Sequence, residues 1–479
     1  MSPRRLASET VLYGFAGGLG KALALITVPI LSRTLGPGDY GLADLAVGFS
    51  ALAVTVVLFA GDIPAARLRG RAHSVAERQV IITNWVVATV VVAILATLVL
   101  VPFAGLLSTQ VWAEPEQAGL ALLSILLIPI AATQAALANV LRIEGRAIAA
   151  VAMAIVDLVA QLGLAIALVV AGFGPTGVIL GFILGSAIGL AAAAVVAARH
   201  FVPDIRPRLG AGIVTAGLAF LPASTVTIAA EYVVRSEVAV GLGTEAVGHF
   251  AVAIRLASVM LLVSAAFSLA WGPHGLQRRP GAATTRVFGA VLELFTVGAV
   301  AVAVAGAALA PEIVVVISGA GFRPAAEALP GLILAAAMTG VFSVLVIAAG
   351  MEDRRRVVPI AAFAGGIVQV GLTAVLLGPL GLAGVGIGAI AARSLSIVML
   401  ARDTRDTIGR RPMAWVSLAI GVALVVLLQV AARTPAETVG LRVGLVILVG
   451  LVLLPLWRVR LRANLAALGE SHSAPAGIR

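Results

Sequence analysis

Three basic residues lie inside long apolar segments and are the main candidates for chemistry: Lys21, Arg255 and Arg393. A charge inside a hydrocarbon layer is costly, so such residues normally face a polar cavity, a partner charge or a substrate. Fixed positive charge at these positions suits an anionic substrate group, with Arg33 nearby as a further cation. In the alternative interpretation, each cation extends to a lipid headgroup or pairs with a buried acid.

The acidic residues within or beside these segments are Asp44, Asp157, Glu231 and Glu293. Asp157 is near the middle of its segment, and Gln161 follows one helical turn later on the same face. The Asp157 carboxylate could carry a coupling proton or sodium ion, or it could neutralise Lys21 or Arg255. The sequence leaves both roles open.

The other polar residues of the segments carry weaker signals. Glu231 and Arg235 have the spacing of a helical salt bridge, whereas Asp44 and Glu293 are near segment ends, where we expect water to reach them. Hydrogen bonds between helices are expected for the amides Gln134, Asn139 and Gln369. The five histidines are scattered and cysteine is absent, so neither a metal site nor any other cofactor is expected.

The composition requires that these residues be positioned by membrane helices. Of the 479 residues 61% are hydrophobic and 11% are charged, and the mean hydropathy is +1.11. A soluble globule cannot bury that much apolar surface, so a soluble enzyme, a coiled coil and a disordered chain are excluded. The sequence predicts an all-α integral membrane protein.

The apolar segments are long enough to span a bilayer, and we count fourteen of them. They are Val11–Ser32, Tyr40–Ala60, Val80–Phe103, Ala118–Val140, Ile148–Ala171, Pro175–Ala198, Ala211–Val234, Ala246–Trp271, Val287–Ala310, Ala328–Gly350, Val357–Leu377, Leu382–Ala401, Met413–Ala432 and Val443–Trp457.

Basic residues indicate how these segments are oriented, because Lys and Arg next to spans are retained in the cytoplasm. With a cytoplasmic N-terminus, 25 of the 33 basic residues fall in inner segments, 5 in outer loops and 3 within spans. The distribution predicts cytoplasmic termini. It also explains the net charge of +11 without a nucleic-acid partner, since arginines beside spans meet anionic headgroups.

Two glycine-containing patterns recur at an offset of 207 residues. Leu35–Gly41 and Leu242–Gly248 both read L-G-x-x-x-x-G, and Gly174 corresponds to Gly381 at the same offset. The offset equals six units of one helix and one loop, so the two halves have the same orientation, as in a parallel repeat. The predicted regions are two six-helix lobes at 1–200 and 211–401, an inter-lobe linker at 201–210, two further helices within 402–457 and a basic cytoplasmic tail at 458–479.

The stretch Leu31–Gly41, which reads LSRTLGPGDYG, resembles the L-S-R-x-L-G-P-x-x-Y-G opening of the polysaccharide-export flippases. These belong to the multidrug/oligosaccharidyl-lipid/polysaccharide superfamily, whose fold is MATE-like. Support comes from Glu231–Arg235 followed by Leu242–Ala253, and from Trp271–Pro273, which is similar to the end of the eighth span in that family. The sequence departs from the family pattern at Glu231, at the spacing to Arg235 and at Phe250.

The resemblance implies two lobes around a central cavity that opens to either side of a bacterial cytoplasmic membrane in turn. The implied function is flipping of a polyprenyl-pyrophosphate-linked oligosaccharide, a precursor of a cell-surface polysaccharide, with a polymerase or glycosyltransferases as partners. Lys21 and Arg255 would bind the pyrophosphate, assisted by Arg393 or Arg33. A cation-coupled multidrug exporter on the same fold is the alternative, and it would rely more on buried acids. An enzyme is disfavoured because the longest outer loops leave no room for a catalytic domain.

The predicted topology can be checked by cysteine labelling, because the chain contains no native cysteine. An Arg355→Cys variant in intact cells should not react with an impermeant maleimide added outside, but should react after permeabilisation. Reaction from the outside would overturn the topology.

Overall fold

The computed structural model describes residues 3–276, 281–351, 356–409 and 412–431, together with positions 440, 444 and 447. The side chains of most of residues 3–24, Lys21 among them, are outside this description. Within the described residues, nine helices are long and apolar enough to cross a membrane, or ten if one bent pair counts as a span. The protein is therefore a multi-pass, all-helical membrane protein.

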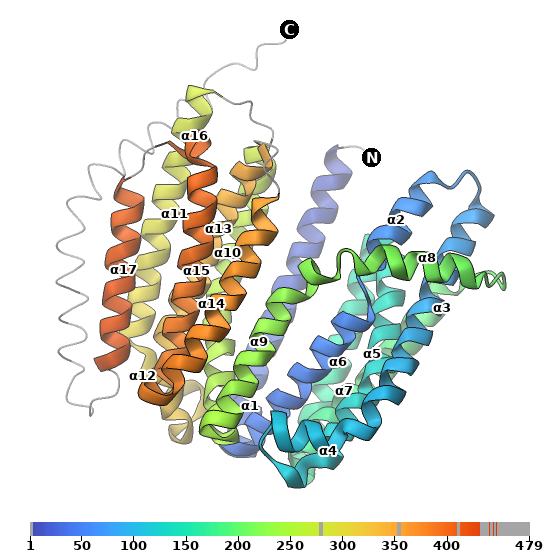
Figure 1. Ribbon diagram of the computed structural model, residues 1–479, viewed down its shortest axis with the longest axis horizontal. Helices are drawn as coiled ribbons and strands as arrows, with labels where there is room; N and C mark the ends of the chain where they lie inside the picture. Colours follow the sequence, from blue (N-terminus) through green and yellow to red (C-terminus); the bar gives the residue numbers. More distant parts are fainter. Residues whose placement is uncertain are drawn as a thin grey trace. The chain divides into compact units, whose positions relative to one another are not determined.

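The chain divides into two compact units, Met1–Ala251 and Val252–Arg479 (Figure 1). The first unit contains α1 (Pro3–Val57), α2 (Asp62–Arg71), α3 (Val75–Leu100), η1 (Val101–Phe103), α4 (Ala104–Leu106), η2 (Leu107–Val111), η3 (Pro115–Gln117), α5 (Ala118–Ile143), α6 (Ala147–Leu168), η4 (Val169–Phe173), α7 (Gly174–Ala197), η5 (Ala198–His200), α8 (Pro207–Leu218), α9 (Leu221–Leu242) and the start of α10 (Thr244–Leu276).

The second unit continues α10 and adds α11 (Ala282–Ala308), α12 (Ala310–Ser318), η6 (Ala320–Glu327), α13 (Leu329–Met351), α14 (Val357–Leu380), α15 (Leu382–Asp403), α16 (Arg405–Ile408) and α17 (Pro412–Ala431). Its core contains Phe288 and Leu345, and α17 contributes Leu428 to it. The buried amide of Gln429 in α17 donates to the Ala383 carbonyl at 2.7 Å. Helix α17 is thus an integral part of this unit.

Helices cover the first thirteen predicted segments, and only Gly444 and Ile447 of the fourteenth are described. The first two segments form one element, α1, interrupted at Gly36. The seventh differs more, because the predicted segment Ala211–Val234 is divided between α8 and α9, which are bent by 59°. α8 buries Gly210, Ile213 and Gly217 and exposes its other faces, and α8 and α9 are long and apolar enough for a span only when they are taken together.

Glycines separated by the 207-residue offset share their backbone conformation as well as their residue type. Gly36 has φ 73° and ψ 172°, and Gly243 has φ 86° and ψ 170°. Gly174 has φ 56° and ψ −145°, and Gly381 has φ 52° and ψ −140°. Positive φ is strained for residues with a side chain, which explains glycine at all four positions. Superposition of two complete lobes stays a prediction.

The last glycines of the two motifs pack the motifs against each other. A Cβ on Gly41 would collide with the Thr244 carbonyl, and a Cβ on Gly248 would collide with the Pro37 carbonyl. The two contacts are equivalent under the 207-residue offset, because Gly41 corresponds to Gly248 and Pro37 to Thr244. The L-G-x-x-x-x-G pattern therefore combines a backbone break with a close helix contact.

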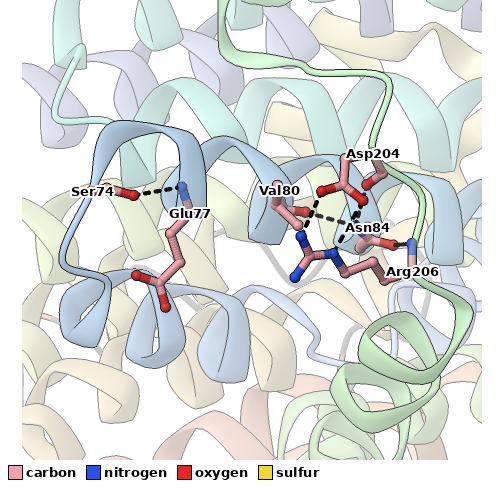
Figure 2. Close-up of polar contacts among 6 residues, drawn as sticks. All are labelled: Ser74, Glu77, Val80, Asn84, Asp204 and Arg206. Carbon is pink, nitrogen blue, oxygen red and sulfur yellow. Dashed lines mark hydrogen bonds and ion pairs between the residues drawn. The ribbon is translucent and has the colours of Figure 1, made fainter.

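The segment between α7 and α8 is held by side chains of α3 (Figure 2). Asn84 is buried, donates to the carbonyls of Val80 and Asp204 at 2.8 and 2.9 Å, and accepts from the Arg206 amide at 2.5 Å. The Thr83 hydroxyl accepts from the Val202 amide at 3.1 Å. These bonds satisfy backbone groups that leave regular helix, so most of the predicted linker is fixed to the first unit.

Glu144, in the connection between α5 and α6, contacts side chains from two other elements of the first unit. Its carboxylate accepts from Arg69 of α2 at 2.5 and 3.0 Å and lies 3.6 Å from His200 Nδ1. Partial burial raises the pKa of Glu144, but the hydrogen bond and charge of Arg69 outweigh it and hold the pKa below its ordinary value. The ion pair thus persists at neutral pH.

Candidate functional site

A cavity of about 340 Å³ with both polar and apolar lining lies within the first unit, among α1, α5 and α6. Gly20 contributes from α1 and Asp157 from α6. The described residues that line it are Gly20, Gln134, Ala135, Ala138, Asn139, Arg142, Ala154, Ile155, Asp157 and Leu158. On each of α5 and α6 the lining residues follow helical spacing along one face, so two packed helices present all of them together.

The Asp157 carboxylate is oriented by a chain of hydrogen bonds behind it. Gln161 Nε2 donates to Asp157 Oδ1 at 2.9 Å and lies 3.0 Å from the Ser186 hydroxyl of α7. Gly189 leaves the space this requires, because a Cβ there would lie 2.6 Å from Asp157 Oδ1. The carboxylate is therefore held in one orientation beside the cavity.

The remaining polar lining comes from α5. Gln134 is 7% exposed, and within the described residues neither Gln134 nor Asn139 forms a hydrogen bond. The expectation that these two amides bond between helices stays a prediction, because the side chains of most of residues 3–24 are outside the description. Arg142 is exposed, and it brings positive charge to the cavity. The cavity thus combines an acid, two amides and a guanidinium group.

The other predicted residues lie elsewhere. Lys21 directly follows Gly20 of the cavity lining, but its side chain is outside the description. Arg255 is half-buried in α10, and the Arg393 guanidinium lies 5.4 Å from the ring centre of Phe342. Arg33 is exposed. Glu293 of α11 is only 3% exposed, which is far less than its position near a segment end predicted.

The structure brings Asp44 together with Arg235, a pairing the sequence did not predict. Arg235 Nε donates to Asp44 Oδ2 at 2.9 Å; the Asp44 side chain is buried and the Arg235 side chain is 13% exposed. Glu231 is exposed, and its carboxylate is 4.0 Å from Arg235. The predicted helical pair is therefore secondary, and Asp44 is shielded where we expected water. Beside them, Tyr232 accepts a hydrogen bond from the buried indole of Trp112 at 2.9 Å.

Sequence reasoning missed two kinds of residue. Arg142 counted only as a topology signal, although Gln134, Ala138 and Arg142 recur at the four-residue spacing of one helix face. That spacing was the available signal for the cavity. Asp44 and Arg235 are 191 residues apart, and no local pattern joins them.

No family model matches the sequence, and no curated protein matches it either. Among solved structures, the chain is similar to the lipid II flippase MurJ in an inward closed conformation, with a TM-score of 0.70, 14% identity, and coverage of 94% of this chain and 99% of that one. It is also similar to an inward-facing MATE-family multidrug resistance transporter, with a TM-score of 0.57, 17% identity, and coverage of 80% and 95%. It is similar as well to an outward-facing MATE-family multidrug resistance transporter, with a TM-score of 0.52, 18% identity, and coverage of 90% of this chain and 97% of that one.

At these identities the likeness shows the fold. The chain has the fold shared by MurJ and the MATE transporters, and the proteins it resembles are flippases and transporters. What this chain transports depends on its own cavity and intramembrane charges, which the likeness in fold does not determine.

The Asp44–Arg235 pair should contribute strongly to stability. Removing one member of a buried pair leaves an uncompensated charge, at a cost of about 3–5 kcal/mol. Asp44→Ala and Arg235→Ala should therefore each lower the thermal unfolding midpoint of the purified protein. The double variant should lose less than the sum of the two single losses. The control is Glu231→Ala, which removes an exposed carboxylate and should change stability by less than about 1 kcal/mol. Strictly additive losses would show that the pair is not coupled.

Proposed function

We propose that this protein is a flippase that moves a polyprenyl-pyrophosphate-linked oligosaccharide from the inner to the outer leaflet of a bacterial cytoplasmic membrane by alternating access. The observation that carries the proposal is the presence of basic residues inside apolar helices of a fold similar to that of a lipid flippase. A pyrophosphate needs fixed positive charge to enter a region of low dielectric constant.

Lys21 and Arg255 are the proposed pyrophosphate ligands, with Arg393 or Arg33 assisting. Arg255 and Arg393 belong to helices that are long and apolar enough to span a membrane, namely α10 and α15. A small number of cations suits a transporter, because cargo held in a tight cage would not be released. Lys21 directly follows Gly20, which lines the cavity of the first unit.

The alternative is a cation-coupled multidrug exporter. It is favoured by the similarity to MATE-family transporters and by Asp157, whose carboxylate could hold a coupling proton or sodium ion. Asp44 and Glu293 are the other buried acids on which such coupling could depend. Asp44 is already paired with Arg235, which favours a structural role for this acid.

The remaining parts of the proposal concern the surroundings of the protein. The two lobes would be 1–200 and 211–401, joined by 201–210, with further helices in 402–457, a cytoplasmic tail at 458–479 and both termini in the cytoplasm. A polysaccharide polymerase or glycosyltransferases would act before or after the flipping step.

Substitution of the intramembrane cations tests the proposal. Loss of one charge-assisted contact costs roughly 1.5–3 kcal/mol, or about ten- to a hundredfold in affinity. In proteoliposomes that contain a labelled polyprenyl-pyrophosphate oligosaccharide, Lys21→Ala and Arg255→Ala should therefore each reduce flipping strongly. Lys21→Arg keeps the charge and should retain part of the activity.

Protein abundance and thermal unfolding of each variant provide the control for folding. If Lys21→Ala and Arg255→Ala both flip the lipid at the wild-type rate, these cations are structural. The pyrophosphate assignment would then be wrong.

A further inference from the structure

The cavity of the first unit is lined by a largely buried amide that forms no hydrogen bond with another described residue. Gln134 lines the cavity, is 93% buried, and forms no hydrogen bond within the described residues. A buried amide is normally hydrogen-bonded, because leaving it without a partner costs about 1–3 kcal/mol. Asn139, five residues later, lines the same space and also lacks a hydrogen bond there. Two amides are thus available to a ligand.

The lining matches the chemistry of a carbohydrate. A sugar hydroxyl both donates and accepts, so it needs carboxylate or carbonyl acceptors beside amide or guanidinium donors. Asp157 is an acceptor when ionised, Gln134 and Asn139 provide both functions, and Arg142 is a donor. The apolar lining, with Ile155 and Leu158, suits the C–H face of a sugar ring.

The dimensions of the cavity agree with this chemistry. About 340 Å³ is at the lower end of the roughly 300–1,000 Å³ typical of small-molecule sites, and it is much larger than one metal ion needs. The guanidinium group of Arg142 also disfavours a bare cation in the same space. A single small polar molecule is the best fit.

We infer that this cavity binds one sugar ring of the transported glycan, with Asp157, Gln134 and Asn139 bonded to its hydroxyls and Arg142 at the ring or at the adjoining phosphate. This inference rests on the proposed flippase function. It adds a specificity site, because a pocket that hydrogen-bonds a hydroxyl discriminates strongly against substrates that lack it.

Soluble sugars test the site without a lipid carrier. The full-length protein in detergent is titrated with methyl glycosides of glucose, galactose, mannose and N-acetylglucosamine, and binding is followed by saturation-transfer difference NMR. At least one glycoside should bind to the wild type. Gln134→Leu, which keeps the volume but removes the amide, should weaken that binding about tenfold or more.

Two controls separate binding from folding. Gln369→Leu makes the same chemical change in α14, outside the cavity, and should bind the glycoside like the wild type. Gln134→Leu should unfold at or above the wild-type temperature, because it replaces a largely buried amide, which bonds to none of the described residues, with an apolar group. A stable Gln134→Leu protein that binds the glycoside normally would overturn the inference.

Other outcomes would also contradict it. If no glycoside binds to the wild type, or if sodium ions stabilise the protein against a choline control while the glycosides do not, the cavity is not a sugar site.

Flipping assays keep this result separate from the proposed function. Gln134→Leu should slow flipping of the glycan-bearing lipid and leave sugar-free polyprenyl pyrophosphate unaffected. If Gln134→Leu slows both lipids equally, the sugar site is wrong, but the proposed flippase function is not contradicted. Failure of the wild type to move either lipid would contradict the flippase itself.

Discussion

A charge or polar group inside an apolar helix bundle must be paired, bonded or facing a polar space, and this constraint organises the first unit. Arg235 is paired with Asp44, and Asp157 is bonded to Gln161 with Ser186 behind it. The amides of Gln134 and Asn139 instead face a cavity. Groups that the described residues satisfy stabilise the bundle, whereas the two cavity amides are the groups that we propose for substrate binding.

Small residues make these placements possible. A Cβ on Gly48 would lie 3.3 Å from Tyr232 and 3.4 Å from Arg235, and Gly189 leaves space for Asp157. Close helix packing in membranes depends on such residues, because lipid and side chains are equally apolar. The glycines therefore determine both which helices touch and where a charged side chain fits. Exchanging Gly189 for a larger residue would displace Asp157 and not simply loosen α6 from α7.

Sequence reasoning succeeded where a local feature has one structural cause. Apolar runs predicted the helices because a bilayer sets their length, and the 207-residue offset marked glycines with matching positive-φ conformations at 36 and 243. It did not foresee the 59° bend that divides the seventh segment between α8 and α9, because hydropathy gives no signal for a break inside an apolar run. The Asp44–Arg235 pair and the cavity depend on contacts across the unit, which spacing along one helix cannot specify.

The central claim is that the intramembrane charges of this fold serve an anionic glycolipid and not a cationic drug. The most direct measurement compares both substrate classes in the same proteoliposomes. A labelled polyprenyl-pyrophosphate oligosaccharide is followed by an impermeant quencher, and ethidium accumulation is followed under a proton or sodium gradient. Our account predicts that the wild-type protein exposes the glycolipid to the opposite leaflet and leaves ethidium at the protein-free level. Gradient-driven ethidium transport without movement of the glycolipid would contradict it.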